Sequence, residues 1–273
     1  MTINCNGSLI DLASPKILGI LNLTPDSFYD GGNFQETTKA QKQCEKLLEE
    51  GADFIDLGAY SSRPGAKEVS EKEELKRLIP VLETLKKTFP NALFSIDTFR
   101  SKVAKECLDR GAAMINDISA GNLDEVMLKV VGQFHVPYIA MHMQGKPKTM
   151  QDNPTYSDLF TEMMHFFSSK ISDCQAAGIQ DVILDPGFGF GKTTAHNFSL
   201  LKQFDRFQQF NCPVLAGVSR KSMIYKTLAN SAADALNGST VLHTVALLKK
   251  AQLLRVHDVK EAKECVTLLK QLQ

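Results

Sequence analysis

The chain of 273 residues has no tryptophan, no net charge and no long apolar segment. Its 31 basic and 31 acidic residues balance, so the charge predicts neither a nucleic-acid partner nor an anionic-membrane partner. No apolar run approaches the roughly 20 residues that a membrane-spanning helix needs. Residues 1–11 show no basic stretch followed by an apolar one, so we expect no secretory signal.

Cysteine and histidine are present but lack the spacing of functional sites. No two cysteines form a C-x-x-C pair, and the histidines show no H-E-x-x-H or other metal-ligand spacing. This argues against zinc and against a disulfide framework, and it fits a reducing cytoplasm. We expect the cysteines to be small buried hydrophobes. They are Cys5, Cys44, Cys107, Cys174, Cys212 and Cys265.

What the sequence does contain is a strict alternation of short apolar runs and helical patterns. The runs are too short for core helices and are bounded by Gly, Pro, Asn or Asp, which predicts strands. They cover residues 17–23, 53–59, 93–98, 114–119, 138–143, 182–187, 213–219 and 253–258. Helical patterns cover residues 37–50, 71–89, 101–110, 123–134, 157–177, 196–209, 234–252 and 259–269.

Alternating strands and helices predict an α/β fold with a parallel sheet, because parallel neighbours need crossover connections. Eight such units in a chain of this size favour a single closed (β/α)8 barrel of the TIM type over an open sheet. No linker or shift in composition divides residues 1–273, so we expect one domain. Residues 1–11 precede the first strand and are expected to form a short extension that closes the bottom of the barrel.

Every predicted strand ends in polar or ionisable residues. In a barrel these ends meet at one mouth, where the active sites of this fold lie. Taken singly, each such residue is more often structural, but eight ends that converge predict a functional site. The residues are Asn22, Ser61, Ser62, Arg63, Asp97, Asn116, Asp117, His142, Asp185, Ser219, Lys221, Arg255 and His257.

Arg255 and His257 are two residues apart on one predicted strand, so their side chains point to the same side. A planar arginine fork beside an imidazole suits phosphate or pyrophosphate. The alternative is a salt bridge at the rim, to Asp258 or to a neighbouring helix.

Asp97, Asn116 and Asp185 end three different predicted strands. A carboxylate there accepts two parallel hydrogen bonds from an amidine-like edge, such as that of guanine or pterin. The alternative for the acids is helix capping, which we expect for Asp117 but not for Asp97 or Asp185.

Three glycine-bearing loops follow the predicted strands. Residues 186–193, PGFGFGKT, resemble a phosphate-binding loop, but Pro186 and Lys192 break the required glycine spacing. We expect this backbone to pass close to a flat ligand, with Phe190 as an aromatic wall; a core-packed Phe190 is the alternative. Residues 24–34 and 61–70 overhang the same mouth and are expected to be lids, with plain surface loops as the alternative.

Seven segments, in order along nearly the whole chain, resemble the dihydropteroate synthase family. They are residues 20–28 (ILNLTPDSF), 62–65 (SRPG), 95–98 (SIDT), 115–118 (INDI), 184–190 (LDPGFGF), 219–222 (SRKS) and 255–257 (RVH). The resemblance implies that 6-hydroxymethyl-7,8-dihydropterin pyrophosphate condenses with p-aminobenzoate to give 7,8-dihydropteroate and pyrophosphate, in folate biosynthesis. It also implies a homodimer.

The resemblance assigns roles to individual residues. It implies a Mg²⁺ ion on the pyrophosphate, held at Asn22. It implies pterin recognition by Asp97, Asn116, Asp185 and Lys221, and phosphate contacts from Ser62, Arg255 and His257. The p-aminobenzoate side would be formed by Phe28, Arg63, Pro64, Phe190 and Ser222. Orientation and stabilisation of the leaving group would fall to Arg255, His257, Lys221 and Arg63.

One segment departs from the family pattern. The family more usually has Glu-Ser-Thr before Arg-Pro-Gly, whereas this chain has Ala59-Tyr60-Ser61-Ser62 at that place. A hydroxyl is kept at Ser62, but a carboxylate is missing, which leaves open what anchors the loop.

Two other functions compete with the synthase. A pterin-binding methyltransferase domain that hands a methyl group to a corrinoid protein would share the pterin cup but has no use for a pyrophosphate clamp. A barrel that binds pterin without catalysis would be expected to have lost a clamp residue, and none is lost.

Overall fold

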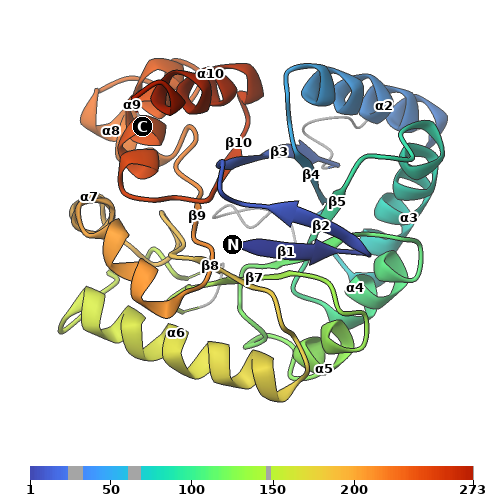
Figure 1. Cartoon of the computed structure of the whole chain (residues 1–273), viewed down its shortest axis with the longest axis horizontal. Helices are drawn as coiled ribbons and strands as arrows, with labels where there is room; N and C mark the ends of the chain where they lie inside the picture. The colour runs from blue at the N-terminus through green and yellow to red at the C-terminus, as the bar shows by residue number, and fades with distance from the viewer. Residues whose placement is uncertain (24–32, 61–68, 146–148, 273) are drawn as a thin grey trace.

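The structure, a computed structural model, describes residues 1–23, 33–60, 69–145 and 149–272. All eight predicted strands are present and form one parallel sheet that curls into a barrel (Figure 1). The strands are β3 (Lys16–Asn22), β4 (Phe54–Gly58), β5 (Phe94–Asp97), β6 (Met114–Asp117), β7 (Tyr138–Met141), β8 (Val182–Asp185), β9 (Leu215–Ala216) and β10 (Leu253–Val256). A parallel bridge between Leu184 and Val214 joins the two ends of the sheet and closes the barrel.

Helices surround the barrel, as the alternation predicts (Figure 1). They are α2 (Asn33–Glu49), α3 (Glu71–Thr88), α4 (Ser101–Leu108), α5 (Met127–Gly132), α6 (Leu159–Ala176), α7 (Thr194–Lys202), α8 (Ser222–Thr227), α9 (Leu236–Leu248) and α10 (Val259–Lys270). None of the described helices is long and apolar enough to cross a membrane.

The helix predicted at residues 196–209 is wrong in its second half. The α-helix α7 ends at Lys202, and the 3₁₀ helix η1 (Phe204–Phe210) follows. Phe204, Phe207 and Phe210 recur every three residues, which matches the 3.0-residue turn of a 3₁₀ helix. Phe204 and Phe207 are fully buried, so this spacing places both rings in the core.

A β-hairpin precedes the barrel. Its strands β1 (Thr2–Cys5) and β2 (Ser8–Asp11) pair antiparallel, and Figure 1 shows the hairpin lying across the barrel. Ile3 packs in one cluster with Leu18 and Phe54, from the N-terminal halves of β3 and β4. The Asn4 backbone N–H donates to Asp181, just before β8, at 2.7 Å. The hairpin therefore lies against the end of the barrel opposite to the mouth.

The side chains inside the barrel change from apolar to polar along the strands. The lower layer contains Leu18, Phe54, Met114, Ile139, Ile183, Leu215 and Leu253. Two residues further along, on the same face of the strands, lie Asp56, Asn116, Asp185 and Arg255. The polar layer therefore lies at the C-terminal side of the barrel, where the sequence predicts the site.

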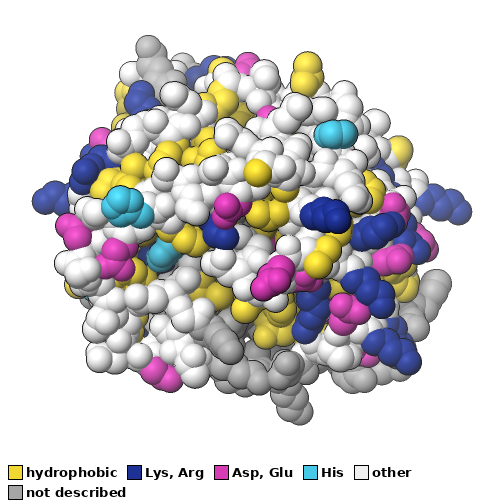
Figure 2. All heavy atoms as spheres, turned by 90° about the horizontal axis from the view of Figure 1, so that it is seen from below, with side chains coloured by type: hydrophobic (Ala, Val, Ile, Leu, Met, Phe, Trp, Pro, Cys, Tyr) yellow, Lys and Arg dark blue, Asp and Glu magenta, His cyan; other side chains and the backbone are white. Residues whose placement is uncertain are grey.

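The distribution of charged side chains and the burial of the cysteines can be compared with what the composition predicts. On the face shown in Figure 2, basic and acidic side chains are interspersed rather than gathered by sign. All six cysteines are free; five are buried, which confirms these as small core residues, whereas Cys212 is only half-buried. Burial raises the pKa of the Cys5, Cys44 and Cys107 thiols to about 12, so these thiols stay protonated at neutral pH.

Candidate active site

One guanidinium joins three strands in the polar layer. Arg255 on β10 donates from Nε to Asp56 Oδ2 on β4 at 2.6 Å. Its Nη2 donates to Asp97 Oδ2 at the end of β5, also at 2.6 Å. Asn116 Nδ2 on β6 donates to the same Asp56 oxygen at 3.0 Å. The predicted residues Asp97, Asn116 and Arg255 thus lie together, and Asp56 is the group that connects them.

Sequence analysis missed Asp56. The residue is fully buried in the middle of an apolar strand, and its Oδ1 has no hydrogen-bond partner in the described part of the chain. A charged side chain in a buried run is itself a signal, because such a charge must be paired. Here the partner is Arg255, which lies 199 residues away in the sequence.

The electrostatics of this cluster are set by burial and by pairing. Burial raises the pKa of Asp97 to about 7, although Arg255 opposes the shift, and the charge of Asp56 adds to it. Burial alone would lower the pKa of Arg255, but Asp56 and Asp97 outweigh burial and raise it above its usual value. Arg255 therefore stays charged, whereas Asp97 changes its protonation near neutral pH.

A second group of predicted residues lies around the end of β8. Asp185 Oδ1 accepts from the Gly187 N–H at 2.8 Å, and burial raises the pKa of Asp185. Lys221 donates to the Phe188 carbonyl, and its ammonium lies 4.6 Å from the centre of the Phe190 ring. Burial lowers the pKa of Lys221 to about 8.

Gly217 keeps the space beside these two charges open. A Cβ at this position would lie 4.0 Å from Asp185 Oδ2 and also 4.0 Å from Lys221 Nζ. A larger side chain would therefore occupy the gap between carboxylate and ammonium. The half-buried Phe190 borders the same region, and the predicted core-packing alternative applies instead to Phe188, which is fully buried.

The loop at residues 186–193 is held from inside by Lys192. The Lys192 ammonium donates to the carbonyls of Gly187 at 3.0 Å and Phe190 at 3.1 Å, and it lies 3.0 Å from His142 Nδ1. Burial lowers the pKa of Lys192 to about 7 and that of His142 to about 3. The lysine that breaks the phosphate-loop spacing thus binds its own loop.

Two glycines of this loop are required by close contact with another segment of the same chain, residues 142–144, rather than by a ligand. Gly187 has a φ of +67°, and a Cβ there would overlap the His142 carbonyl oxygen. A Cβ at Gly191 would lie 2.6 Å from the Gln144 carbonyl oxygen. The close backbone approach expected for a flat ligand is therefore made to the segment that follows β7.

The salt bridge to Asp258 that was considered as the alternative role of Arg255 and His257 is made by another residue. Arg220, not Arg255, pairs with Asp258, and its fork reaches both carboxylate oxygens at 2.8 Å. His257 is exposed, and its Nδ1 lies 3.1 Å from Ser219 Oγ. Ser222 is half-buried at the start of α8.

The helix-capping role predicted for Asp117 is wrong, because α5 begins only at Met127 and has no side-chain cap; Asp117 instead stabilises a turn. Its carboxylate accepts from the backbone N–H of Ser119 at 2.7 Å and of Gly121 at 2.8 Å. It also accepts from the Tyr138 hydroxyl at 2.6 Å. These bonds fix the turn after β6 and leave the mouth to Asn116, the preceding residue.

The remaining predicted residues lie at the end of β3 or outside the described ranges. Asn22 is the last residue of β3, and it is half-buried beside Gly58 of β4. Within the described ranges, no three His, Cys, Asp or Glu residues gather in a way that could hold a metal ion. Phe28, Ser62, Arg63 and Pro64 lie outside the described residues.

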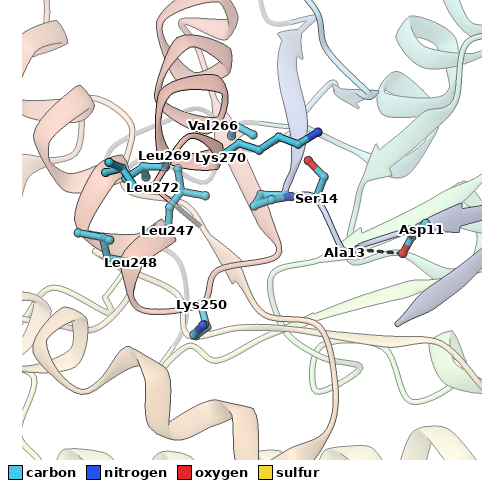
Figure 3. Close-up of a pocket in the computed structure, with 11 residues that line it drawn as sticks. Asp11, Ala13, Ser14, Leu247, Leu248, Lys250, Val266, Leu269, Lys270 and Leu272 are labelled. Atoms are coloured by element: carbon cyan, nitrogen blue, oxygen red, sulfur yellow. Dashed lines mark hydrogen bonds between the residues drawn. The ribbon is translucent and has the colours of Figure 1, made fainter.

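A cavity of about 490 Å³ lies away from this site (Figure 3). Its walls come from the C-terminal ends of α9 and α10 and from Asp11, Ala13, Ser14 and Pro15, which precede β3. Leu247, Leu269 and Leu272 form much of the lining, and Lys250 and Lys270 also contribute. None of the predicted site residues lines it, so the cavity and the polar mouth are separate features.

Comparison with known proteins identifies relatives over nearly the whole chain. Residues 18–257 match the family described as pterin binding enzymes. The chain is 42% identical over 271 residues to dihydropteroate synthase of Escherichia coli (strain K12), covering 98% of this chain and 95% of that protein. It is 44% identical over 262 residues to the Haemophilus influenzae protein of the same name, covering 95% and 94%.

Solved structures agree with these relatives. Yersinia pestis dihydropteroate synthase in complex with a sulfonamide drug superposes with a TM-score of 0.93 at 41% identity, covering 100% of this chain and 98% of that chain. Xanthomonas albilineans dihydropteroate synthase with 4-aminobenzoic acid superposes with a TM-score of 0.92 at 38% identity, with the same coverage. The predicted barrel is thereby confirmed, and the chain belongs to the dihydropteroate synthase family of pterin-binding enzymes.

Proposed function

We propose that the chain condenses 6-hydroxymethyl-7,8-dihydropterin pyrophosphate with p-aminobenzoate, giving 7,8-dihydropteroate and pyrophosphate. The observation that carries this proposal is the polar layer at the barrel mouth of a member of this family. There, the acceptors Asp97, Asn116 and Asp185 lie beside two cations, Lys221 and Arg255. Acceptors for a flat heterocycle and cations for an anion are what the two halves of this substrate require.

The pterin half fits the acceptors that remain available. Asp185 uses Oδ1 for the Gly187 N–H, which leaves Oδ2 for the N–H edge of a pterin. Asn116 donates to Asp56 through Nδ2, which leaves its amide oxygen as an acceptor. The ring would enter beside Gly217, where the lack of a side chain keeps the space between Asp185 and Lys221 open.

The pyrophosphate half fits the remaining donors of the same cluster. Arg255 uses Nε and Nη2 for its two carboxylates, and its Nη1 makes no hydrogen bond within the described ranges. That Nη1 donates to the departing phosphate, and His257 acts from the exposed rim of the same strand. Negative charge builds up on the leaving group as its bond to the pterin methylene breaks, and fixed donors stabilise that charge.

The arylamine half needs little help from a base. The amine of p-aminobenzoate is neutral and carries a lone pair, so the residues on this side orient it rather than deprotonate it. Phe190 and Ser222 lie at the mouth, and we propose that they bind p-aminobenzoate with Phe28, Arg63 and Pro64. The last three lie outside the described residues.

We also propose that Mg²⁺ accompanies the pyrophosphate and is held on the protein side by Asn22. Mg²⁺ prefers hard oxygen ligands and usually keeps waters and substrate phosphates around one or two protein groups. A single amide oxygen at the end of β3 fits that pattern. The ion, when bound, neutralises charge on the leaving group.

A homodimer in the cytoplasm completes the proposal. Large exposed apolar side chains occur just after α8 and on α9 and α10, among them Leu228, Val241, Leu248 and Leu268. A second copy of the chain would remove this apolar surface from water. Five buried, free cysteines suit a reducing compartment.

The test is direct. The purified chain is incubated with the pterin pyrophosphate, p-aminobenzoate and Mg²⁺, and formation of dihydropteroate and pyrophosphate is measured together. Omitting p-aminobenzoate is the control for simple hydrolysis of the pyrophosphate ester. No dihydropteroate from a folded protein would refute the proposal, and methyl transfer to a corrinoid protein would replace it.

A further inference from the structure

The loop at residues 186–191 is tied to the segment that follows β7 through a pair of buried ionisable side chains. Lys192 Nζ lies 3.0 Å from His142 Nδ1. It donates to the carbonyls of Gly187 at 3.0 Å and Phe190 at 3.1 Å, and more weakly to the His142 carbonyl at 3.3 Å. Both side chains are buried, so water does not replace these contacts.

The number of protons that this pair can hold follows from its geometry. An ammonium has three N–H donors and no acceptor, so the ring nitrogen that it faces must offer a lone pair. The three closest acceptors, two carbonyls and His142 Nδ1, match the three donors of Lys192. His142 is therefore neutral, with its proton on Nε2. A second proton, at Nδ1, would set N–H against N–H and one positive charge against another.

The surroundings of the His142 ring do not suit an imidazolium. The ring packs edge to face on Phe166, with 4.8 Å between the ring centres. Phe167 and Tyr156 lie at 6.5 Å and 6.2 Å by the same measure. Burial, followed by the charge of Lys192, lowers the pKa of His142 to about 3.

Other ionisable groups near the pair lie on three sides of it. Asp185, at the end of β8, favours the charged form of Lys192, and Lys221, just before α8, opposes it. The Tyr156 hydroxyl donates to the Gly191 carbonyl of the same loop at 2.7 Å. His196 on α7 packs on the Tyr156 ring, with 5.2 Å between the ring centres. Asp185 thus supports the lysine, whereas the charge that acts on His142 is the lysine itself.

We propose that Lys192 and His142 form an acid-sensitive switch, which holds the loop at residues 186–191 against the segment after β7 and releases it when His142 takes up a second proton. The inference does not depend on the proposed function. In the released state His142 reaches water and titrates near its ordinary pKa of about 6.5. In the closed state the pKa is about 3. Opening therefore takes up a proton, and the closed state loses stability as pH falls from about 6.5 towards 3.

Hydrogen exchange of the substrate-free protein tests the switch. The reporters are the amides of Gly189 and Phe190, which donate to Asn197 Oδ1 and to the Gly187 carbonyl in the closed loop. After correction for the intrinsic exchange rate, and relative to the strand β4, their protection should fall by about tenfold or more between pH 7 and pH 5. Lys192, whose pKa is lowered to about 7, contributes only about twofold in this window.

Two histidine variants separate the switch from general acid sensitivity. His142→Asn keeps an acceptor for Lys192 but does not titrate, so protection should be equal at pH 7 and pH 5. His196→Asn is the matched control, because it removes the neighbouring imidazole and should keep the full fall.

Lys192→Met serves if His142→Asn does not fold. It removes the donor that the three acceptors share, so protection at pH 7 should already be about tenfold lower than in the unmodified protein. Equal protection of the unmodified loop at both pH values would overturn the switch. So would a fall that persists in His142→Asn, a fall that disappears in His196→Asn, or full protection in Lys192→Met. Because no substrate is present, none of these outcomes bears on the proposed function.

Discussion

The Asp56 carboxylate is the group on which the charge arrangement of the mouth depends most directly. It is fully buried and accepts hydrogen bonds from Arg255 at 2.6 Å and from Asn116 at 3.0 Å. Asp56→Asn keeps the size of the side chain and removes its charge. The new amide also carries two N–H donors into a place where the neighbouring groups already donate, so at least one donor is left without a partner.

The loss of stability expected for Asp56→Asn depends on the hydrogen-bond partner that Arg255 retains. Removing one partner of a buried ion pair costs about 3–5 kcal/mol when the other charge is left uncompensated. Arg255 retains Asp97 at 2.6 Å, so we expect only the loss of a hydrogen bond between charged groups, about 1.5–3 kcal/mol. Because Asp56 also raises the pKa of Asp97, its removal makes Asp97 a better partner, which favours the lower end.

Thermal unfolding followed by circular dichroism measures this cost. At roughly 2–4 °C for each kcal/mol, Asp56→Asn should lower the melting temperature by about 3–12 °C, with the lower half of that range favoured. Glu106→Gln removes a carboxylate from an exposed pair with Arg110 and should change it very little. If Asp56→Asn had the same melting temperature as the unmodified protein and bound pterin equally well, Asp97 alone would hold Arg255. Our account of Asp56 would then be wrong.

Three further predictions concern residues that are proposed to bind the substrate. Asp185→Asn places a donor against the donors of the pterin edge, at about 1–3 kcal/mol, so calorimetry should show pterin affinity reduced at least tenfold with little change in melting temperature; equal affinity would remove Asp185 from the pterin site. Arg255→Lys keeps the charge but loses the fork, so kcat at saturating substrates should fall about tenfold or more, and undiminished turnover would contradict the clamp. Burial raises the pKa of Asp97 to about 7, so this carboxyl gains a proton as pH falls through that value. Binding of a pterin without pyrophosphate should therefore weaken between pH 8 and pH 6 in the unmodified protein but not in Asp97→Asn, and matching pH profiles would count against the role.

The barrel could be predicted from the sequence because its signals are local. Each buried strand is a short apolar run between residues that favour turns, and parallel pairing then fixes where the strand ends meet. The predicted helix at residues 196–209 shows the limit. Phe204 and Phe207 are buried and three residues apart, which one face of an α-helix and of a 3₁₀ helix both allow, so packing rather than pattern decides between them.

Most members of the candidate site could be predicted, but the buried Asp56 and the pairing of the charged groups could not. Asp97, Asn116, Asp185 and Arg255 were identified from their places at the strand ends. Which groups Arg255 would contact depends on register across the barrel, since its two carboxylates lie 199 and 158 residues away in the sequence. Lys192 shows the same limit, because only the folded loop places its ammonium against the carbonyls of its own loop.

The described groups of the polar layer also carry a charge balance that bears on the substrate. Asp56, Asp97 and Asp185 face the cations Lys221 and Arg255, so full ionisation of these five would leave one net negative charge. Burial raises the pKa of Asp97 and of Asp185, so uptake of a proton by Asp97 near neutral pH lowers the negative charge of the mouth. A pyrophosphate entering such a mouth meets carboxylates as well as an arginine. A cation that travels with the substrate, or a proton held on Asp97, removes that repulsion, which is why the proposed Mg²⁺ and the titration of Asp97 belong to the same physical requirement.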